Sequence, residues 1–351
     1  MQHNPVVHDE MTRLARPAPP LTARQIALLF PTGGALWPGM AEDLDRADAF
    51  APWIDRANEA LVGEGVADGA LRGLLAGEGQ IKRVATEAGW EWVGDFPLSM
   101  AAQAVVGSCL AEGFVRTQGE PGAVAGESMG ECAAYCVAGV LDLEDAVRVA
   151  WRWARALQRA SDELGLRMAV VDGIPWGQLE PMAARWDAVV VVAEAPTLVV
   201  LSVPIAHLGG LQAEVLAAQG NLLVSSNACV AHDPRLGARA HVWLEHEDFL
   251  ASLPMRAPKR ELWTAVGGVR RLTQVEELRA NLRATTTTRV AWDELVGMLP
   301  SLGIRAAWQL GMPSKAYALE RLKAEDDRLA SMKMRAVRTL AMAMRPSIPP
   351  R

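Results

Sequence analysis

Apolar runs and helical patterns alternate along the first half of the chain. Ile26–Phe30 is a short apolar run that ends at Pro31 and a pair of glycines, as expected for a buried strand followed by a loop. Apolar residues recur with helical spacing over residues 41–62, 66–76, 98–114 and 143–164. Asp142 is placed as the N-cap of the last helix, with Asp145 three residues later. Strands separated by helices indicate an α/β domain.

A different pattern follows over about 60 residues, in the order strand, helix, strand, strand, helix, strand. The six segments lie at residues 168–171, 176–185, 188–193, 197–203, 207–219 and 221–225. This order is that of a ferredoxin-like unit, so we expect a small domain inserted into the larger one. Two later apolar runs, 262–266 and 306–311, return to the first sheet, and a helix follows from about Ser314.

The predicted division of the chain has four parts. A Pro-rich mobile leader covers residues 1–24, the large α/β domain covers 25–165 and 231–330, the inserted domain covers 166–230, and a C-terminal tail covers 331–351. A length of 351 residues is long for one compact domain, which agrees with such a division.

The composition argues against several classes of function. Half of the residues are hydrophobic, yet no run approaches the roughly 20 apolar residues of a membrane span, and the start lacks a signal-peptide pattern. We therefore expect a cytoplasmic protein without membrane contact. A net charge of −6 argues against general nucleic-acid binding. The four cysteines form no C-x-x-C pair, so we expect buried thiols and no metal site.

Residues 126–130, Gly-Glu-Ser-Met-Gly, match the G-x-S-x-G pattern of a nucleophile elbow. In this turn a strand gives way to a helix, the two glycines permit a strained backbone, and the hydroxyl of Ser128 is exposed above the sheet. The helix begins directly after the serine, which places the backbone N–H of Met129 to stabilise an oxyanion. The pattern alone is short and arises by chance, so its assignment depends on the rest of the chain.

A serine nucleophile needs a base, and the chain has six histidines. His232 lies where the inserted segment ends and the chain returns to the large domain, so it would face the cleft between the domains. We predict that His232 is the base. The alternative is a surface histidine in a turn with Asp233 and Pro234.

Several motifs together resemble those of the acyl-CoA:acyl-carrier-protein acyltransferases, that is, the malonyl transacylases of fatty acid synthesis and the acyltransferases of polyketide synthases. Residues 30–34 with 38–40 resemble the family's F-P-G-Q-G loop and its following G-M, and residues 126–131 resemble G-H-S-x-G-E. Residues 138–148 resemble the next helix, and residues 308–311 resemble a V-E-V-G-P strand. The resemblance covers roughly residues 25–325 and is strongest over residues 124–150.

The resemblance implies an α/β-hydrolase-like large domain with an inserted ferredoxin-like domain, and a two-step transfer. Ser128, deprotonated by His232, attacks a coenzyme A or carrier-protein thioester, and the backbone N–H groups of Met129 and Gly33 hold the oxyanion. The acyl group then passes to the phosphopantetheine thiol of an acyl carrier protein, so one or two carrier proteins are the expected partners. No bound cofactor is implied. Backbone carbonyls orient the histidine in this family, and we expect them near Ala265 and Val266.

Trp153 is the most informative departure from the family pattern. Malonyl-using members place an arginine there, which pairs with the free carboxylate of the acyl group. An indole cannot neutralise a carboxylate, and an unpaired buried charge costs on the order of 3 to 5 kcal/mol. Arg152 and Arg155 lie off this register, because one residue turns a helix by about 100°. We therefore predict an acyl group without a free carboxylate. The alternative is that Trp153 is core and another arginine does this work.

Four further positions bear on the pocket. Ala231, before the histidine, leaves room for a larger acyl chain, and Trp37 would add an apolar wall beside Trp153. Gly33 replaces the family's glutamine, and Glu127 replaces the histidine before the nucleophile. A carboxylate at Glu127, or at the residue after His232, is expected to raise the pKa of that histidine.

The predicted function is a discrete acyltransferase that loads a non-malonyl acyl group in polyketide or related biosynthesis. The alternatives are an editing hydrolase that removes acyl groups from carrier proteins, and a non-catalytic docking relative. A basic face near the C-terminus would suit an acidic carrier protein, with a solvated helix surface as the alternative. Its residues are Lys315, Arg321, Lys323, Lys333, Arg335 and Arg338.

Overall fold

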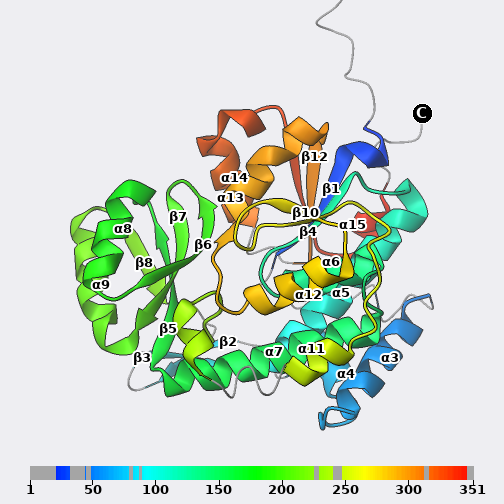
Figure 1. The fold of residues 1–351 in the computed structure, drawn as a ribbon, viewed down its shortest axis with the longest axis horizontal. Helices are drawn as coiled ribbons and strands as arrows, with labels where there is room; N and C mark the ends of the chain where they lie inside the picture. Colours follow the sequence, from blue (N-terminus) through cyan, green and yellow to red (C-terminus); the bar gives the residue numbers. More distant parts are fainter. Residues whose placement is uncertain are drawn as a thin grey trace, which may run out of the picture.

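The large part of the molecule is built on a six-stranded sheet, and a second, smaller sheet lies beside it (Figure 1). The computed structural model describes residues 21–31, 44, 49–78, 82–86, 89–224, 229–239, 247–311 and 316–345. The large sheet has the strand order β10-β9-β4-β1-β12-β13. Its strands are β1 (Ile26–Phe30), β4 (Ala123–Gly126), β9 (Leu262–Thr264), β10 (Arg270–Leu272), β12 (Ala306–Leu310) and β13 (Lys333–Val337).

The centre of the large sheet is parallel and covered on both faces. β4, β1, β12 and β13 run parallel, β9 pairs parallel with β4, and β10 pairs antiparallel with β9. Every residue of β1, β4 and β12 is buried, as in a sheet with helices on both sides. Along β1, Leu28 belongs to one apolar cluster and Leu29 to the other, because successive side chains point to opposite faces.

Long helices cover one face of this sheet. α5 (Phe96–Gln118), α6 (Gly130–Ala138) and α7 (Leu143–Glu163) supply most of the larger cluster, and α3 (Ala51–Val62) and α4 (Ala70–Ala76) pack outside them. On the opposite face lie α13 (Trp292–Met298) and α14 (Ala316–Glu325). The described residues of the large part also include α11 (Glu247–Ser252), α12 (Val275–Ala284) and α15 (Leu340–Met344). The predicted helices at 98–114 and 143–164 are therefore present. Those expected at 41–62 and 66–76 are shorter than predicted, since residues 49–50 form a turn before α3 and α4 begins at Ala70.

α5 is the central helix of the larger cluster. The Asp95 carboxylate accepts a hydrogen bond from the Leu98 backbone N–H at 2.9 Å and so caps its start. By length and composition alone α5 would suffice to cross a membrane, but 89% of its apolar window is buried inside the protein. Seventeen of its 23 residues are buried, so the apolar side chains of α5 pack inside the protein.

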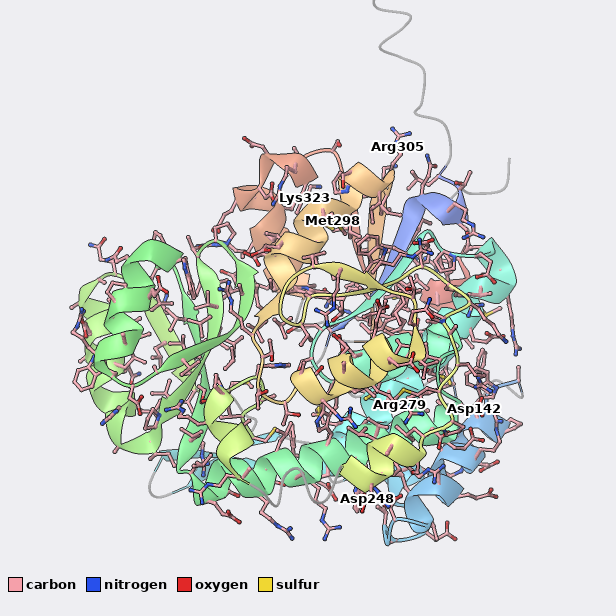
Figure 2. All side chains as sticks on the ribbon, in the orientation of Figure 1. Asp142, Asp248, Arg279, Met298, Arg305 and Lys323 are labelled. Atoms are coloured by element: carbon pink, nitrogen blue, oxygen red, sulfur yellow. The ribbon has the colours of Figure 1, made fainter. Side chains whose placement is uncertain are left out.

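Three local expectations about the ends of elements hold only in part. Asp142 is the N-cap residue of α7, as predicted, but its side chain makes no capping hydrogen bond and pairs instead with Arg256 at 2.5 Å, on the surface that Figure 2 shows. The predicted tail at 331–351 includes β13, which covers the edge of β12, and α15 after it. Within the predicted leader 1–24, residues 23–24 belong to a 3₁₀ turn, Ala23–Gln25, that leads into β1, while residues 1–20 lie outside the described part.

The inserted segment has the predicted ferredoxin-like order. Its elements are β5 (Leu166–Asp172), α8 (Trp176–Arg185), β6 (Val189–Ala195), β7 (Leu198–Pro204), α9 (Leu208–Ala217) and β8 (Asn221–Val224). These strands make antiparallel pairs in the order β6-β7-β5-β8, and a separate apolar cluster fills the space under α8 and α9. The predicted fold class, an α/β-hydrolase-like domain with a ferredoxin-like domain, is confirmed.

Two features of the sheets were not predicted. β11 (Val290–Ala291), from the large part of the chain, joins the small sheet in parallel with β6. A two-residue strand carries too little periodicity to be found in the sequence. β2 (Lys82–Thr86) and β3 (Gly89–Val93) form a separate antiparallel hairpin.

Candidate active site

Ser128 occupies a strained turn between β4 and α6. Its φ of 56° lies in the left-handed region, which a serine rarely adopts. The backbone N–H of Glu127 still donates to the Phe30 carbonyl at 2.9 Å, so the turn begins directly at the end of the parallel pair. A Cβ at Gly126 would overlap the Glu131 backbone, and a Cβ at Gly130 would overlap the Phe30 carbonyl. Both glycines of the G-x-S-x-G pattern are therefore required sterically.

His232 lies against this serine. Its Nε2 is 2.6 Å from Ser128 Oγ, and its Nδ1 is 3.1 Å from the Thr288 carbonyl oxygen. A carbonyl only accepts, so Nδ1 carries the proton and Nε2 accepts from the serine hydroxyl. The backbone N–H of His232 also donates to the Thr286 carbonyl at 2.8 Å. The side chain is 1% exposed, which excludes the surface-turn alternative.

The carbonyl that orients His232 comes from a different segment than expected. Thr288 follows α12, whereas the expectation placed the orienting carbonyl near Ala265. Ala265 instead accepts a hydrogen bond from the Ala291 backbone N–H at 2.9 Å. The segment that contains Thr288 therefore lies next to the predicted segment around Ala265. Nothing in the sequence marks Thr288 as the residue whose carbonyl orients the histidine.

Burial lowers the pKa of His232 from 6.5 to about 4, and the bond to the Thr288 carbonyl opposes this only in part. The expectation that Glu127 or Asp233 raises the pKa of His232 is therefore wrong. Asp233 is fully buried, and its carboxylate is paired with Arg235 at 2.6 Å. A low pKa keeps the imidazole neutral and able to accept a proton at neutral pH.

Trp153 is buried on α7. It is 3% exposed, and its indole Nε1 is 3.4 Å from Thr286 Oγ1, in the segment that also binds the His232 backbone. Arg152 is paired with Glu64 through two bonds of 2.7 and 3.0 Å, and the Arg155 guanidinium lies 5.2 Å from the centre of a ring of Trp151. Both arginines therefore have partners away from Ser128.

Of the remaining predicted pocket residues, two are buried and two lie outside the described residues. Ala231 is 4% exposed and packs in the larger cluster beside Val230, whose backbone N–H donates to Ser161 Oγ at 2.7 Å. Glu127 is likewise buried, at 2% exposed. Gly33 and Trp37 lie outside the described residues, so the oxyanion role of Gly33 and the pocket role of Trp37 stay predictions.

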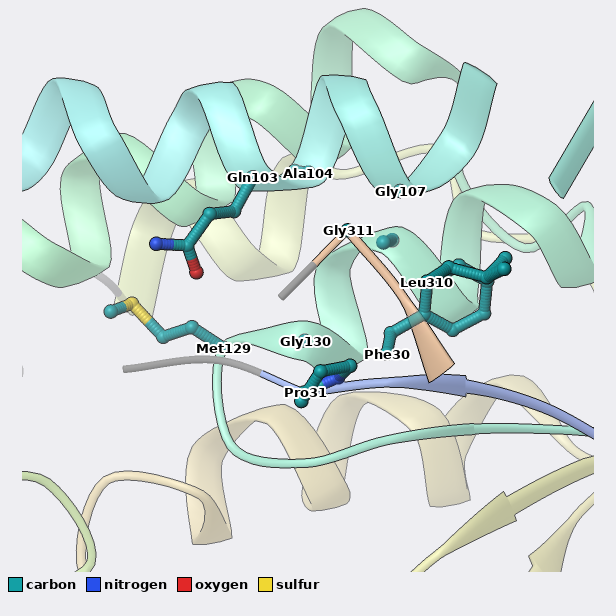
Figure 3. A pocket seen from close by; sticks show the side chains of 10 residues that line it. Phe30, Pro31, Gln103, Ala104, Gly107, Met129, Gly130, Leu310 and Gly311 are labelled. Atoms are coloured by element: carbon teal, nitrogen blue, oxygen red, sulfur yellow. The ribbon is translucent and has the colours of Figure 1, made fainter. Parts of the chain in front are cut away.

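A small cavity lies beside the start of α6 (Figure 3). Its walls come from the ends of β1 and β12 and from the facing sides of α5 and α6, and Figure 3 shows the Gln103 amide extending from α5 towards Met129. The space open to the centre of a water molecule is about 10 Å³, which suits roughly one water. This cavity is too small for an acyl chain.

A buried polar network supports the nucleophile turn and was not predicted. Glu131, 1% exposed, accepts hydrogen bonds from Thr264 Oγ1, from Asn281 Nδ2 at 2.7 Å and from Thr285 Oγ1 at 3.1 Å. Burial raises the pKa of Glu131 from 4.5 to about 7, although the three hydrogen bonds act to lower it. The glutamate is visible in the sequence motif, but its partners lie more than a hundred residues later. Only the folded chain brings them together.

The basic residues near the C-terminus do not lie on one helix, because Arg321 belongs to α14 and Arg335 to β13. Arg321 on α14 pairs with Asp172 at 3.4 Å and with Glu325, whereas the Arg335 guanidinium on β13 lies 4.4 Å from the centre of a ring of Trp308. Figure 2 shows Lys323 on α14, and Lys315 is outside the described residues. The expected helical pattern is therefore wrong, and the docking of a carrier protein at these residues stays a prediction.

A buried Ser–His pair at the carboxyl end of a parallel strand, with a helix starting behind the serine, is the arrangement that nucleophilic acyl transfer requires. The acyl transferase domain family matches residues 28–289. The chain belongs to this family and is an acyltransferase.

The relatives are large synthases. The chain is 32% identical over 257 residues to polyketide synthase GfsA of Streptomyces halstedii, a match that covers 71% of this chain and 3% of that protein. It is 37% identical over 149 residues to erythronolide synthase EryA3 of Saccharopolyspora erythraea, covering 42% of this chain and 4% of that protein. The chain thus spans only a few per cent of the length of these relatives.

Solved structures share the whole fold. The malonyl CoA-acyl carrier protein transacylase of Coxiella burnetii superposes with a TM-score of 0.76 at 17% identity, covering 93% of this chain and 96% of that one. The corresponding enzyme of Mycobacterium tuberculosis gives 0.74 at 22% identity, covering 91% and 99%. A malonyl-transacylase bound to a type II polyketide synthase acyl-carrier protein gives 0.73 at 19% identity, covering 91% and 98%.

Proposed function

We propose that this chain moves an acyl group without a free carboxylate from a thioester to the phosphopantetheine thiol of an acyl carrier protein, in polyketide or related biosynthesis. The donor is a coenzyme A or carrier-protein thioester, so the chain has one or two carrier-protein partners. The observation that carries the proposal is the buried, neutral Trp153, at the position where the family resemblance puts the carboxylate-binding arginine. Arg152 and Arg155 are engaged elsewhere and leave that position uncharged.

The first half of the reaction forms an acyl-serine. His232 Nε2, 2.6 Å from Ser128 Oγ, takes the hydroxyl proton while the oxygen attacks the thioester carbonyl carbon. The backbone N–H groups of Met129 and Gly33 are proposed to hold the oxyanion. The carbon–sulfur bond then breaks, and His232 returns the proton to the leaving thiol.

The second half reverses these roles. The phosphopantetheine thiol gives its proton to His232, and the thiolate attacks the ester carbonyl of acyl-Ser128. The ester bond breaks, and Ser128 Oγ recovers the proton from His232. Because the Thr288 carbonyl accepts from Nδ1, this nitrogen keeps its proton through both halves, and only Nε2 gains and loses one.

An acyl-group comparison tests the proposal. The protein is incubated with acetyl-, benzoyl- and malonyl-thioesters and then with a holo carrier protein, and both proteins are followed by intact mass. We expect Ser128 to carry the uncharged acyl groups and to pass them to the carrier, while malonyl loading is slower by about 100-fold or more, as an unpaired buried carboxylate costs at least 3 kcal/mol. Malonyl loading at the rate of acetyl would refute the acyl-group assignment.

Two other outcomes point to the other functions. Loss of the acyl adduct as free acid, without transfer, would indicate the editing hydrolase. The Ser128→Ala variant is the control for adducts at other nucleophiles. If wild type and this variant both stay unmodified by every thioester, the chain is a non-catalytic relative.

A further inference from the structure

The residue after His232 is a fully buried carboxylate with a dedicated partner. Asp233 is 0% exposed, and Arg235 Nε lies 3.0 Å from both of its oxygens, while Arg235 Nη2 lies 2.6 Å from Oδ2. The Arg235 backbone N–H also donates to Asp233 Oδ1 at 2.8 Å. Four hydrogen bonds thus fix this carboxylate to a residue two positions later, because a buried charge is tolerated only when it is paired.

The same guanidinium reaches into the small domain. Its Nη1 donates to the Asp187 carbonyl at 2.9 Å and lies 3.2 Å from Asp187 Oδ2, in the turn between α8 and β6. Its Nη2 donates to Ser202 Oγ at 3.2 Å, and Ser202 is fully buried in β7. The turn that carries His232 packs in the core of the large domain through Ala231 and Leu236. Arg235 therefore joins this turn to two elements of the small domain.

The His232 turn needs such support, because its backbone is strained. Its φ of 64° costs on the order of 1 to 3 kcal/mol for a residue with a Cβ and persists only where the surroundings hold it. On its amino side the turn is held by the bond from His232 N–H to the Thr286 carbonyl. On its carboxyl side it is held by Asp233 and Arg235.

We propose that Arg235 is a positioning residue for acyl transfer. It fixes Asp233, and with it the strained turn of His232, to the small domain, so that the placement of the small domain sets the alignment of the imidazole with Ser128. This inference rests on the proposed roles of Ser128 and His232, but not on the identity of the acyl group.

The test compares two arginines that both join the domains. In Arg235→Gln the link to the histidine turn is lost. The matched control is Arg321→Gln, because Arg321 bonds to Thr197 Oγ1 at 3.0 and 3.2 Å and to Asp172 of the small domain from α14, away from His232. The rate of Ser128 modification by a fluorophosphonate is measured by intact mass. We expect it to fall about 10- to 100-fold in Arg235→Gln and to stay within about twofold of wild type in Arg321→Gln.

A double variant separates positioning from simple charge pairing. Arg235→Gln alone leaves Asp233 buried and unpaired, whereas Asp233→Asn with Arg235→Gln removes both charges. We expect the double variant to regain the wild-type melting temperature while its modification rate stays about tenfold or more below wild type. A rate that recovers together with the melting temperature would overturn the proposal, as would equal slowing in the Arg321→Gln control. Wild type that does not react at Ser128 would instead refute the proposed function.

Discussion

Glu131 and His232 give the stability of the fold opposite pH dependences, and the Glu131→Gln variant separates them. Burial raises the pKa of Glu131 from 4.5 to about 7 and lowers that of His232 from 6.5 to about 4, so each shift covers about 2.5 pH units. At 1.36 kcal/mol per unit, each group changes the free energy of unfolding by about 3 kcal/mol between its two limits.

The signs follow from which state holds the proton. Between pH 4.5 and 7 the native state keeps a proton on Glu131 that the unfolded state has lost, so this contribution favours folding at low pH and is lost as the pH rises through 7. Between pH 4 and 6.5 the unfolded state holds a proton on His232 that the native state lacks. The His232 contribution is present above pH 6.5 and is lost as the pH falls through 4. In the wild type the two slopes nearly cancel.

Urea unfolding, followed by tryptophan fluorescence at pH 4.5, 5.5 and 6.5, tests this balance. From pH 4.5 to pH 6.5 we expect the free energy of unfolding of Glu131→Gln, compared with that of the wild type, to rise by about 2 to 3 kcal/mol. The reason is that only the pH dependence due to His232 remains in this variant. In His232→Gln we expect the free energy of unfolding, compared with that of the wild type, to fall by a similar amount over the same pH range. Glu276→Gln, at an exposed position on α12, is the control and should follow the wild type. A Glu131→Gln slope equal to that of the wild type would refute the assignment of a raised pKa.

Three further outcomes follow from the site. The rate of Ser128 modification by a fluorophosphonate should stay level from neutral pH down to about pH 5 and fall with a midpoint near 4, and a midpoint near 6.5 would contradict the burial of His232. Trp153→Arg should gain malonyl loading by about tenfold or more in the mass assay, at a cost of about 2 kcal/mol in urea unfolding, whereas Trp153→Phe should not gain it. Gly130→Ala should abolish modification of Ser128 and lower the melting temperature, because its Cβ would overlap the Phe30 carbonyl, and unchanged modification would exclude that clash.

The parts of the fold that the sequence predicts well are those with a local cause. β1 has the predicted bounds because five successive apolar residues end at a proline. The inserted domain has the predicted order because its elements are short, regular and separated by turns. β13 was missed because Lys333 and Arg335 give it the appearance of a polar segment, although it is an edge strand, where charged residues are common.

Within the site, too, the features with a local cause are predicted from the sequence and the others are not. Ser128 is found from five consecutive residues, because a nucleophile elbow is a local structure with its own glycine requirement. Thr288, which orients His232, has no local signature, since its contribution is a backbone carbonyl that any residue supplies. The pKa of His232 was predicted with the wrong sign, because sequence neighbours such as Asp233 suggested a charge effect, while the fold paired that charge with Arg235 and buried the ring.

The segment from Thr285 to Ala291 explains why the base is assembled only by the complete fold. Thr285 binds Glu131 behind the nucleophile, and the Thr288 carbonyl accepts from the His232 ring. Two residues later, β11 pairs with β6 of the small sheet, while the Ala291 backbone N–H donates to Ala265 beside the large sheet. One short segment therefore contacts His232, the Glu131 network behind the nucleophile turn, and elements of both sheets. A displacement of either domain must move this segment. The alignment of His232 with Ser128 therefore depends on how the two domains pack together.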